Sequence, residues 1–162
     1  MDARSRFRKG VVGLAAVAMA AVVGLPQAAT AADTTRAMSV AARDYNFSGI
    51  PSRLPAASYD TKFFNASRNE AHELVALRLA NACQGYSRQQ LIDLFRQGED
   101  ATFATCPDLG FEGFAFAPPL ASDRETLELA PGRTVFVCFI PTAQGIGHFE
   151  LGMLTISDVF ST

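Results

Sequence analysis

The chain has 162 residues and a formal net charge of −2, which is the length of a single domain. Its 14 Lys and Arg residues are outnumbered by 16 Asp and Glu residues, so no basic surface of the kind that binds nucleic acid is expected. The chain contains 3 cysteines, and an odd number leaves at least one thiol outside any intramolecular disulfide.

The first 31 residues have the pattern of a secretory signal peptide. A basic start from Arg4 to Lys9 precedes an uncharged Ala- and Val-rich run over 11–25, and small residues at 29–31 suit cleavage. The run is short for a membrane span, so we expect no span once the signal is removed. We therefore predict a signal peptide over 1–31 and one extracytoplasmic domain over 32–162, secreted or held in the periplasm or cell envelope. An uncleaved N-terminal anchor is the alternative.

Alternating apolar and polar residues predict three strands in the first half of the mature chain. They cover residues 44–47, 58–65 and 71–79, and the prolines between them lie in connections. A polar turn precedes the third strand, so His72 stands at the start of that strand.

The middle of the chain changes to helical periodicity. Ser87 and Gln90 have the spacing of a capping box, apolar residues share one face of the segment that follows, and Gly98 suits the end of a helix. We predict one short helix here, inserted between strands, followed by an irregular segment over 99–122 with scattered phenylalanines.

Three more strands are predicted at residues 125–129, 134–140 and 153–160, with a tight Pro131-Gly132 turn between the first two. About seven short strands with a single helix are typical of an antiparallel β-sandwich. The predicted fold class is therefore all-β.

The three cysteines divide into a pair and a single residue. Cys83 and Cys106 flank the same middle segment and have no His or Met nearby, whereas Cys138 lies in a stretch that also holds His and Met. In an oxidising compartment two cysteines normally pair. We predict a Cys83–Cys106 disulfide, stabilising the fold by about 3 kcal/mol, and a free thiol at Cys138.

The stretch from Cys138 to Met153 carries soft and borderline metal ligands. It contains a thiol, the imidazole of His148 and a thioether. A thiolate, two imidazoles and a distant Met form the ligand set of blue-copper sites. The only other histidine is His72, so the predicted copper ligands are His72, Cys138, His148 and Met153.

The order of these features resembles the cupredoxin (plastocyanin/azurin-like) family. The resemblance rests on the strand ending at Asn65 before His72, on the 130–132 turn, and on the string from Cys138 through His148 to Met153; it covers roughly residues 38–160. It implies a Greek-key β-sandwich with copper at one end. By position, it implies the same four ligands as the residue types do.

Two positions depart from the family pattern. Nine residues separate Cys138 from His148, where the family usually has two to four, which predicts a shifted ligand geometry. Glu73 follows His72 where many members carry an Asn that ties the two ligand loops together, which predicts a less rigid site. Phe149, next to His148, is expected beside an exposed imidazole edge through which an electron could leave.

The leading functional hypothesis is an exported mononuclear type 1 copper protein that transfers single electrons to an unidentified redox protein. We expect a monomer that binds no nucleic acid and is not an enzyme, because no histidine is left over for a catalytic set. A copper chaperone or buffer, a metal-free interaction module, and a site for zinc or another ion are the alternatives.

Overall fold

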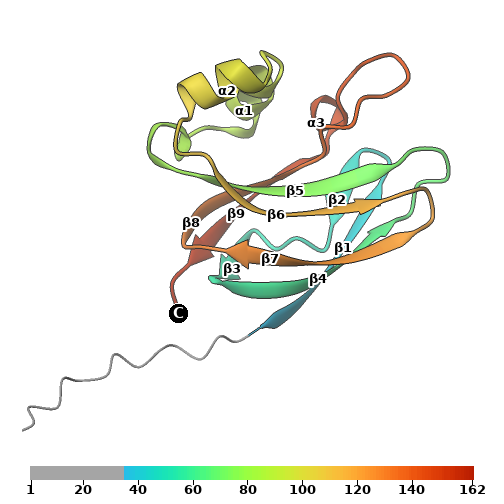
Figure 1. Cartoon of the computed structure of the whole chain (residues 1–162), viewed down its shortest axis with the longest axis horizontal. Coiled ribbons are helices and arrows are strands. Elements are labelled where there is room, and N and C mark those ends of the chain that lie inside the picture. The colour runs from blue at the N-terminus through green and yellow to red at the C-terminus, as the bar shows by residue number, and fades with distance from the viewer. Residues whose placement is uncertain (1–34) are drawn as a thin grey trace, which may run out of the picture. The chain divides into compact units, whose positions relative to one another are not determined.

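Two β-sheets pack face to face in the described part of the chain, residues 35–162 of a computed structural model (Figure 1). The predicted signal peptide lies outside the described residues. In order across the first sheet, the strands are β2 (Asn46–Ser48), β1 (Arg36–Arg43), β4 (Ala57–Asn65) and β7 (Ser122–Leu129). Across the second sheet they are β3 (Arg53–Pro55), β9 (Leu154–Phe160), β8 (Gly132–Val137), β5 (His72–Leu79) and β6 (Gly110–Ala117).

The predicted β-sandwich is confirmed, but its sheets are mixed. β1 pairs with β4 in parallel, and so does β3 with β9, whereas the other pairings between these strands are antiparallel. The expectation of a purely antiparallel sandwich was therefore wrong for two pairs. Alternation in a sequence assigns side chains to faces of a sheet, and it carries no information on strand direction.

The predicted strand at residues 44–47 is also corrected. Asp44 and Tyr45 have positive φ angles of 48° and 59° and form the turn between β1 and β2. Left-handed backbone at two successive residues is the geometry of a tight hairpin turn, whose twist matches that of the flanking strands. The turn places Tyr45 at one end of the sandwich.

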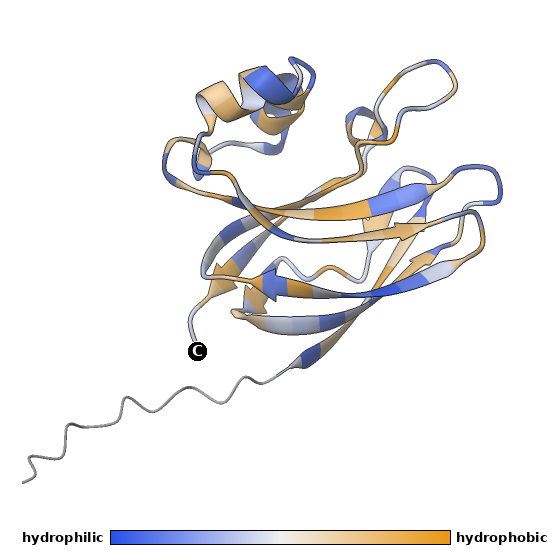
Figure 2. Cartoon of the chain, viewed as in Figure 1, coloured by the Kyte–Doolittle hydropathy of each residue, from blue (hydrophilic) through white to orange (hydrophobic). Residues whose placement is uncertain are grey.

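The core between the sheets follows from alternation along the strands, which is visible as alternating hydropathy in Figure 2. Phe63 of β4 and Leu74 of β5 are 0% exposed, as is Phe136 of β8. The same apolar cluster includes Cys138 and Met153. The residues predicted as sulfur ligands are thus part of the packed interior.

An insertion of helices separates β5 from β6. It contains a 3-10 turn and two helices: η1 (Asn81–Cys83), α1 (Arg88–Phe95) and α2 (Glu99–Thr105). The predicted capping box at Ser87 and Gln90 is confirmed, and so is the Cys83–Cys106 disulfide. The prediction of one helix followed by an irregular segment was wrong, because the segment contains α2 and β6.

The insertion covers part of the outer face of the second sheet. Leu91, Ile92 and Phe95 of α1 pack against Val75 of β5 and Val135 of β8 in a second apolar cluster. A further one-turn helix, α3 (His148–Leu151), precedes β9. In residues 35–162 no helix has the length and apolarity needed to cross a membrane.

Candidate metal centre

Three segments that are distant in sequence meet at one end of the sandwich. His72 is the first residue of β5, Cys138 follows the last residue of β8, and His148 is the first residue of α3. β5 and β8 are antiparallel, with Val75 opposite Val137. The end of β8 therefore lies beside the start of β5, so the register of this pair brings the thiol toward the first histidine.

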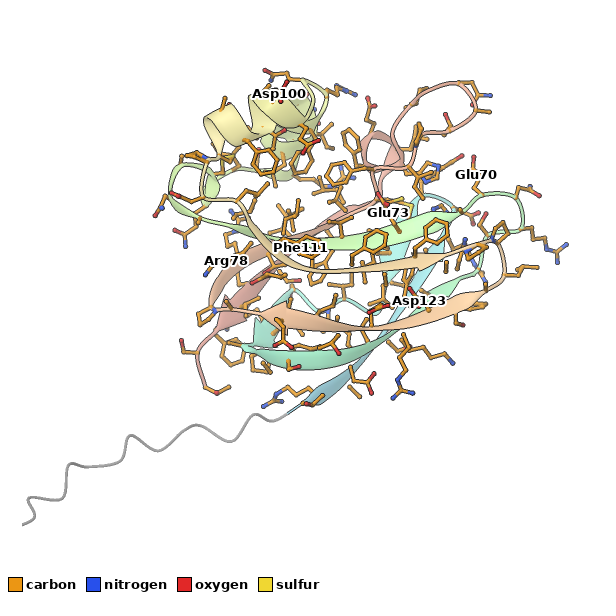
Figure 3. The ribbon with its side chains drawn as sticks, viewed as in Figure 1. Glu70, Glu73, Arg78, Asp100, Phe111 and Asp123 are labelled. Atoms are coloured by element: carbon orange, nitrogen blue, oxygen red, sulfur yellow. A yellow bond between two sulfur atoms is a disulfide. The ribbon has the colours of Figure 1, made fainter. Side chains whose placement is uncertain are left out.

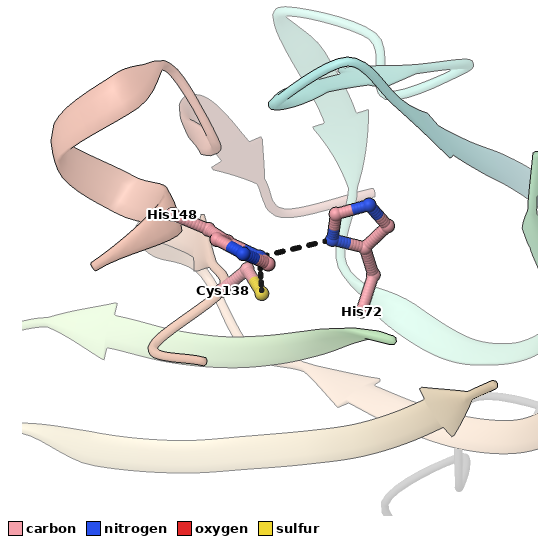
Figure 4. Close-up of side chains that lie close together, drawn as sticks. All are labelled: His72, Cys138 and His148. Carbon is pink, nitrogen blue, oxygen red and sulfur yellow. Dashed lines mark hydrogen bonds between the residues drawn. The ribbon is translucent and has the colours of Figure 1, made fainter. Parts of the chain in front are cut away.

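The donor atoms of these three side chains point toward one another (Figure 4). Nδ1 of His72 lies 3.1 Å from Nδ1 of His148, which lies 3.4 Å from Sγ of Cys138. One donor atom from each residue lies within 4.8 Å of the other two. His72 is 1% exposed, and the other two residues are 0% exposed. The structure thus brings together two imidazoles and a thiol in a fully buried cluster.

Met153 lies next to this cluster through its backbone. Its carbonyl oxygen accepts a hydrogen bond from the backbone N–H of Cys138 at 3.1 Å, and its own N–H donates to the carbonyl of His148 at 3.0 Å. The side chain is 0% exposed and packs in the same apolar cluster as Cys138. The fourth predicted residue is therefore held between two of the other three.

The three converging donors fit a soft or borderline metal ion. Bond lengths of about 2.0–2.3 Å, as zinc makes with imidazole and thiolate, set donors around one ion about 3.3–3.8 Å apart. The separations of 3.1 and 3.4 Å are close to that spacing. Among the described residues, Nε2 of His72 and Nε2 of His148 lack hydrogen-bond partners, whereas both Nδ1 atoms face the interior of the cluster.

Burial fixes the protonation of the cluster. It lowers the pKa of His72 to about 4, with the nearby His148 ring as the second cause, and it also lowers the pKa of His148. Burial raises the pKa of Cys138 to about 11, although two backbone N–H groups partly oppose this. At neutral pH both imidazoles are therefore neutral, the form that binds metals, and the thiol keeps its proton until a cation displaces it.

The long segment between Cys138 and His148 closes on itself. Pro141 pairs with Gly147 in an isolated bridge, and Thr142 N–H donates to the Ile146 carbonyl at 2.8 Å. On the inner side, the N–H of Phe149 donates to the carbonyl of Cys138 at 3.0 Å. The extra residues thus form a hairpin that projects beyond α3 (Figure 1), while its two ends stay bonded to each other. The length therefore does not separate the cysteine from the histidine.

Glu73 ties the two ligand segments together, contrary to the expectation of weak support. Its carboxylate accepts a hydrogen bond from the N–H of Phe139 at 2.8 Å, and its own N–H donates to Sγ of Cys138 at 3.5 Å. Burial raises the pKa of the carboxyl group, and the Phe139 N–H opposes that rise. An acceptor is sufficient here because the partner is a backbone donor.

The expectation of an exposed imidazole edge was wrong, because His148 is fully buried. The Tyr45 ring packs edge-on against it with centroids 5.0 Å apart, and a Glu70 carboxylate oxygen lies 3.7 Å from its Nε2. A hydrogen bond to Glu70 raises the pKa of the Tyr45 phenol. Figure 3 labels Glu70 near the start of β5, at this end of the sandwich.

Sequence reasoning missed both covering residues. Tyr45 lies about 100 positions before His148 in a turn that was predicted as a strand, and a phenol is not one of the donors in the blue-copper ligand set. Glu70 was read as part of a polar turn. The position of Glu70 two residues before His72 was the one signal that could have placed it near the cluster.

No protein-family model and no curated protein matches the sequence. Solved structures do match. Auracyanin A, a "blue" copper protein from the green thermophilic photosynthetic bacterium Chloroflexus aurantiacus, has a TM-score of 0.52 at 13% identity, over 78% of this chain and 100% of that one. A dithionite-reduced auracyanin from Roseiflexus castenholzii has a TM-score of 0.49 at 18% identity, over 76% of this chain and 96% of that one.

Rusticyanin from Thiobacillus ferrooxidans gives a TM-score of 0.48 at 18% identity, over 78% of this chain and 77% of that one. This match and the Roseiflexus match both have TM-scores below 0.5. The auracyanin A match confirms the fold that the sequence resemblance implied, and at 13% identity it speaks for the fold alone.

Proposed function

We propose that this protein, which has the cupredoxin fold, is an exported carrier of single electrons that binds one copper ion through His72, Cys138, His148 and Met153. The observation that supports this most directly is the convergence of two imidazole nitrogens and one thiol sulfur within 4.8 Å in the buried end of a β-sandwich. A thiolate with two imidazoles and a weak thioether is a ligand set that suits copper.

Copper in such a site supplies one-electron chemistry by alternating between Cu(I) and Cu(II). The residues of this chain supply the rest. The two buried histidines stay neutral and available, and Cys138 loses its proton when the cation binds. The Cys138 N–H donates to the Met153 carbonyl and the Met153 N–H donates to the His148 carbonyl, which holds three of the four residues in place in the metal-free protein. This preorganisation keeps the ligands nearly still when the charge of the site changes.

Water is excluded from the site by its neighbours. Phe149 is 6% exposed and follows His148, while Tyr45 packs on the His148 ring. A dry, apolar surrounding favours the less charged state of the site and therefore raises its reduction potential. Because His148 does not reach the surface, we place the electron route at Tyr45, which is the half-buried aromatic ring in contact with it.

Burial of the whole cluster favours an electron carrier over a copper chaperone or buffer. A chaperone must hand its metal to another protein through exposed ligands, whereas all four residues here are at most 1% exposed. A metal-free interaction module would leave two inward-facing imidazole nitrogens and a thiol without a role. Zinc could occupy the same donors, but it has no redox chemistry and could not carry an electron.

The proposal also includes the cellular compartment, the oligomeric state and the partner of the protein. We propose that residues 1–31 are a cleaved signal peptide and that 32–162 act as an extracytoplasmic monomer. The Cys83–Cys106 disulfide supports an oxidising compartment. The partner would be an unidentified redox protein, with neither nucleic acid bound nor bond-making catalysis performed.

Addition of Cu(II) to the purified metal-free protein tests the proposal. We expect one equivalent to bind with an intense visible thiolate-to-copper band that ascorbate bleaches and an oxidant restores. Tight Cu(I) binding without that band would favour the chaperone. Absence of copper binding would refute the function and leave the fold unchanged.

A further inference from the structure

A pocket of about 520 Å³ lies between the helical insertion and the ligand loop, which is the segment over 138–153 that carries three of the proposed copper ligands. Its walls include Leu77 of β5, Leu109 before β6 and Phe103 of α2, and its floor is formed by Phe95, Phe139 and Phe149. Figure 3 labels Asp100 on α2, the helix that carries the lining residues Glu99, Thr102 and Phe103, and Phe111 on β6. The volume is in the range of small-molecule sites, about 300–1,000 Å³.

The floor of the pocket is a cluster of three aromatic rings. Phe95 lies 5.2 Å from Phe139 and 6.0 Å from Phe149, and Phe139 lies 5.7 Å from Phe149, all with edge-on geometry. Such a cluster offers ring faces and edges to a further aromatic ring. Phe139 and Phe103 are 37% and 48% exposed, so apolar surface faces water in the empty pocket, which a ligand would bury.

The wall on the insertion side is held in place. The disulfide joins η1 to the residue after α2, and Arg88 of α1 donates to the carbonyl of Leu154 at 3.1 Å. Arg96 forms an ion pair with Glu150 of α3 at 2.5 Å. These links fix α1 to α3 and to the start of β9, and the disulfide ties the residue after α2 to η1.

The polar groups of the pocket indicate the charge of its ligand. The Thr102 hydroxyl already donates to the Gly98 carbonyl at 2.8 Å, so its proton is used within the helix. Glu99 lines the pocket with an exposed carboxylate. A carboxylate accepts a hydrogen bond from a hydroxyl group and repels an anion.

We propose that this pocket binds a hydroxylated aromatic molecule of one or two rings that carries no negative charge, next to the residues that follow Cys138 and His148. The ring packs on the phenylalanine floor and its hydroxyl group donates to Glu99. Binding does not require a metal, so this site is independent of the proposed function.

The probe for this site is 1-naphthol, titrated into the purified protein with and without copper. We expect saturable one-to-one binding in both forms, followed by fluorescence and by amide chemical shifts near Phe103 and Phe139. The anion 1-naphthalenesulfonate should bind at least about tenfold more weakly, because Glu99 repels it. The substitution Glu99→Gln should reduce the difference in affinity between 1-naphthol and 1-naphthalenesulfonate.

The variant Phe103→Ala should weaken 1-naphthol binding about tenfold, the loss expected for one aromatic contact. Phe111→Ala is the matched control, because Phe111 is 69% exposed on β6 and does not line the pocket. Since both side chains are at least 48% exposed, both variants should fold, which thermal melting checks. Binding that does not saturate, or equal weakening by Phe103→Ala and Phe111→Ala, would overturn the proposal.

Discussion

The proposed metal end of the sandwich and the helical insertion are held in place in opposite ways. The cluster of His72, Cys138 and His148 depends on segments up to 76 positions apart, brought together by strand register and backbone hydrogen bonds. The insertion is local: a capping box starts α1, and a disulfide spanning 23 positions closes it. Only a few side chains, such as Arg96 with Glu150, join the two regions.

A disulfide and the register of a sheet therefore stabilise different parts of the molecule. A disulfide acts mainly on the unfolded chain and restrains a loop without fixing the geometry of a distant site. Donor atoms that must meet within a few tenths of an ångström need the long-range register of a sheet. Substitutions at the cluster should therefore abolish copper binding with little effect on stability, and substitutions in the insertion should lower stability with little effect on copper binding.

The largest effect is expected from a substitution that removes a proposed copper ligand and leaves the rest of the fold intact. Cys138→Ser removes the thiolate, so the visible thiolate-to-copper band should be lost completely, while the circular dichroism of the sandwich is kept. The double variant Cys83→Ser/Cys106→Ser is the control, and its band should keep its position. A retained band in Cys138→Ser, together with a lost one in the control, would show that the wrong sulfur was chosen.

The same double variant tests the insertion. Loss of the disulfide should lower the free energy of unfolding by about 3 kcal/mol, because the unfolded chain regains the freedom of a loop of 23 positions. Urea denaturation of oxidised wild-type protein and the variant measures this difference. A change well below about 1 kcal/mol would mean that the helices hold the insertion without the cross-link.

Acid should destabilise the metal-free protein through the metal end. His72 has its pKa lowered from 6.5 to about 4 by burial, so the unfolded chain binds more protons between these values. Stability should fall as the pH drops from about 6.5 to about 4 and then lose no more from this group, with a loss on the order of 3 kcal/mol. Urea titrations of wild-type protein and His72→Gln across this range should differ in slope.

A smaller effect concerns the bond between the two ligand segments. Glu73→Ala leaves the N–H of Phe139 without its acceptor, which should cost about 1–2 kcal/mol and broaden the copper band. Glu73→Gln retains an acceptor oxygen and is the matched control. If both variants behave like wild type, the hydrogen bond from Phe139 does not support the site.

The smallest effect is expected at the start of α1. Ser87→Ala removes the side-chain acceptor for Gln90 N–H, and the loss should be about 1 kcal/mol in the free energy of unfolding. The copper band should not move. Ser87→Thr keeps a capping oxygen and should retain most of the stability, and a shifted band in Ser87→Ala would link the two regions more tightly than their contacts indicate.

The predictable part of the site came from scarce residue types. The chain has two histidines and one unpaired cysteine, so few other ligand sets were possible. The alternation of apolar and polar residues placed His72 at the start of a strand. The hairpin over 141–147 and the cover by Tyr45 could not be predicted, because they arise from backbone bonds and packing between distant segments. Helix α2 was missed because Phe103 is the only large apolar residue in its seven positions.

The parallel pair of β3 and β9 has a consequence for how the protein is made. Arg53 lies opposite Asp158, and β9 is an interior strand of its sheet. A nascent chain therefore cannot complete that sheet until β9 has been synthesised, and long-range parallel pairing of this kind is slow to form. A prematurely truncated product lacking β9 would have neither a finished interior nor the support that holds Met153 in place.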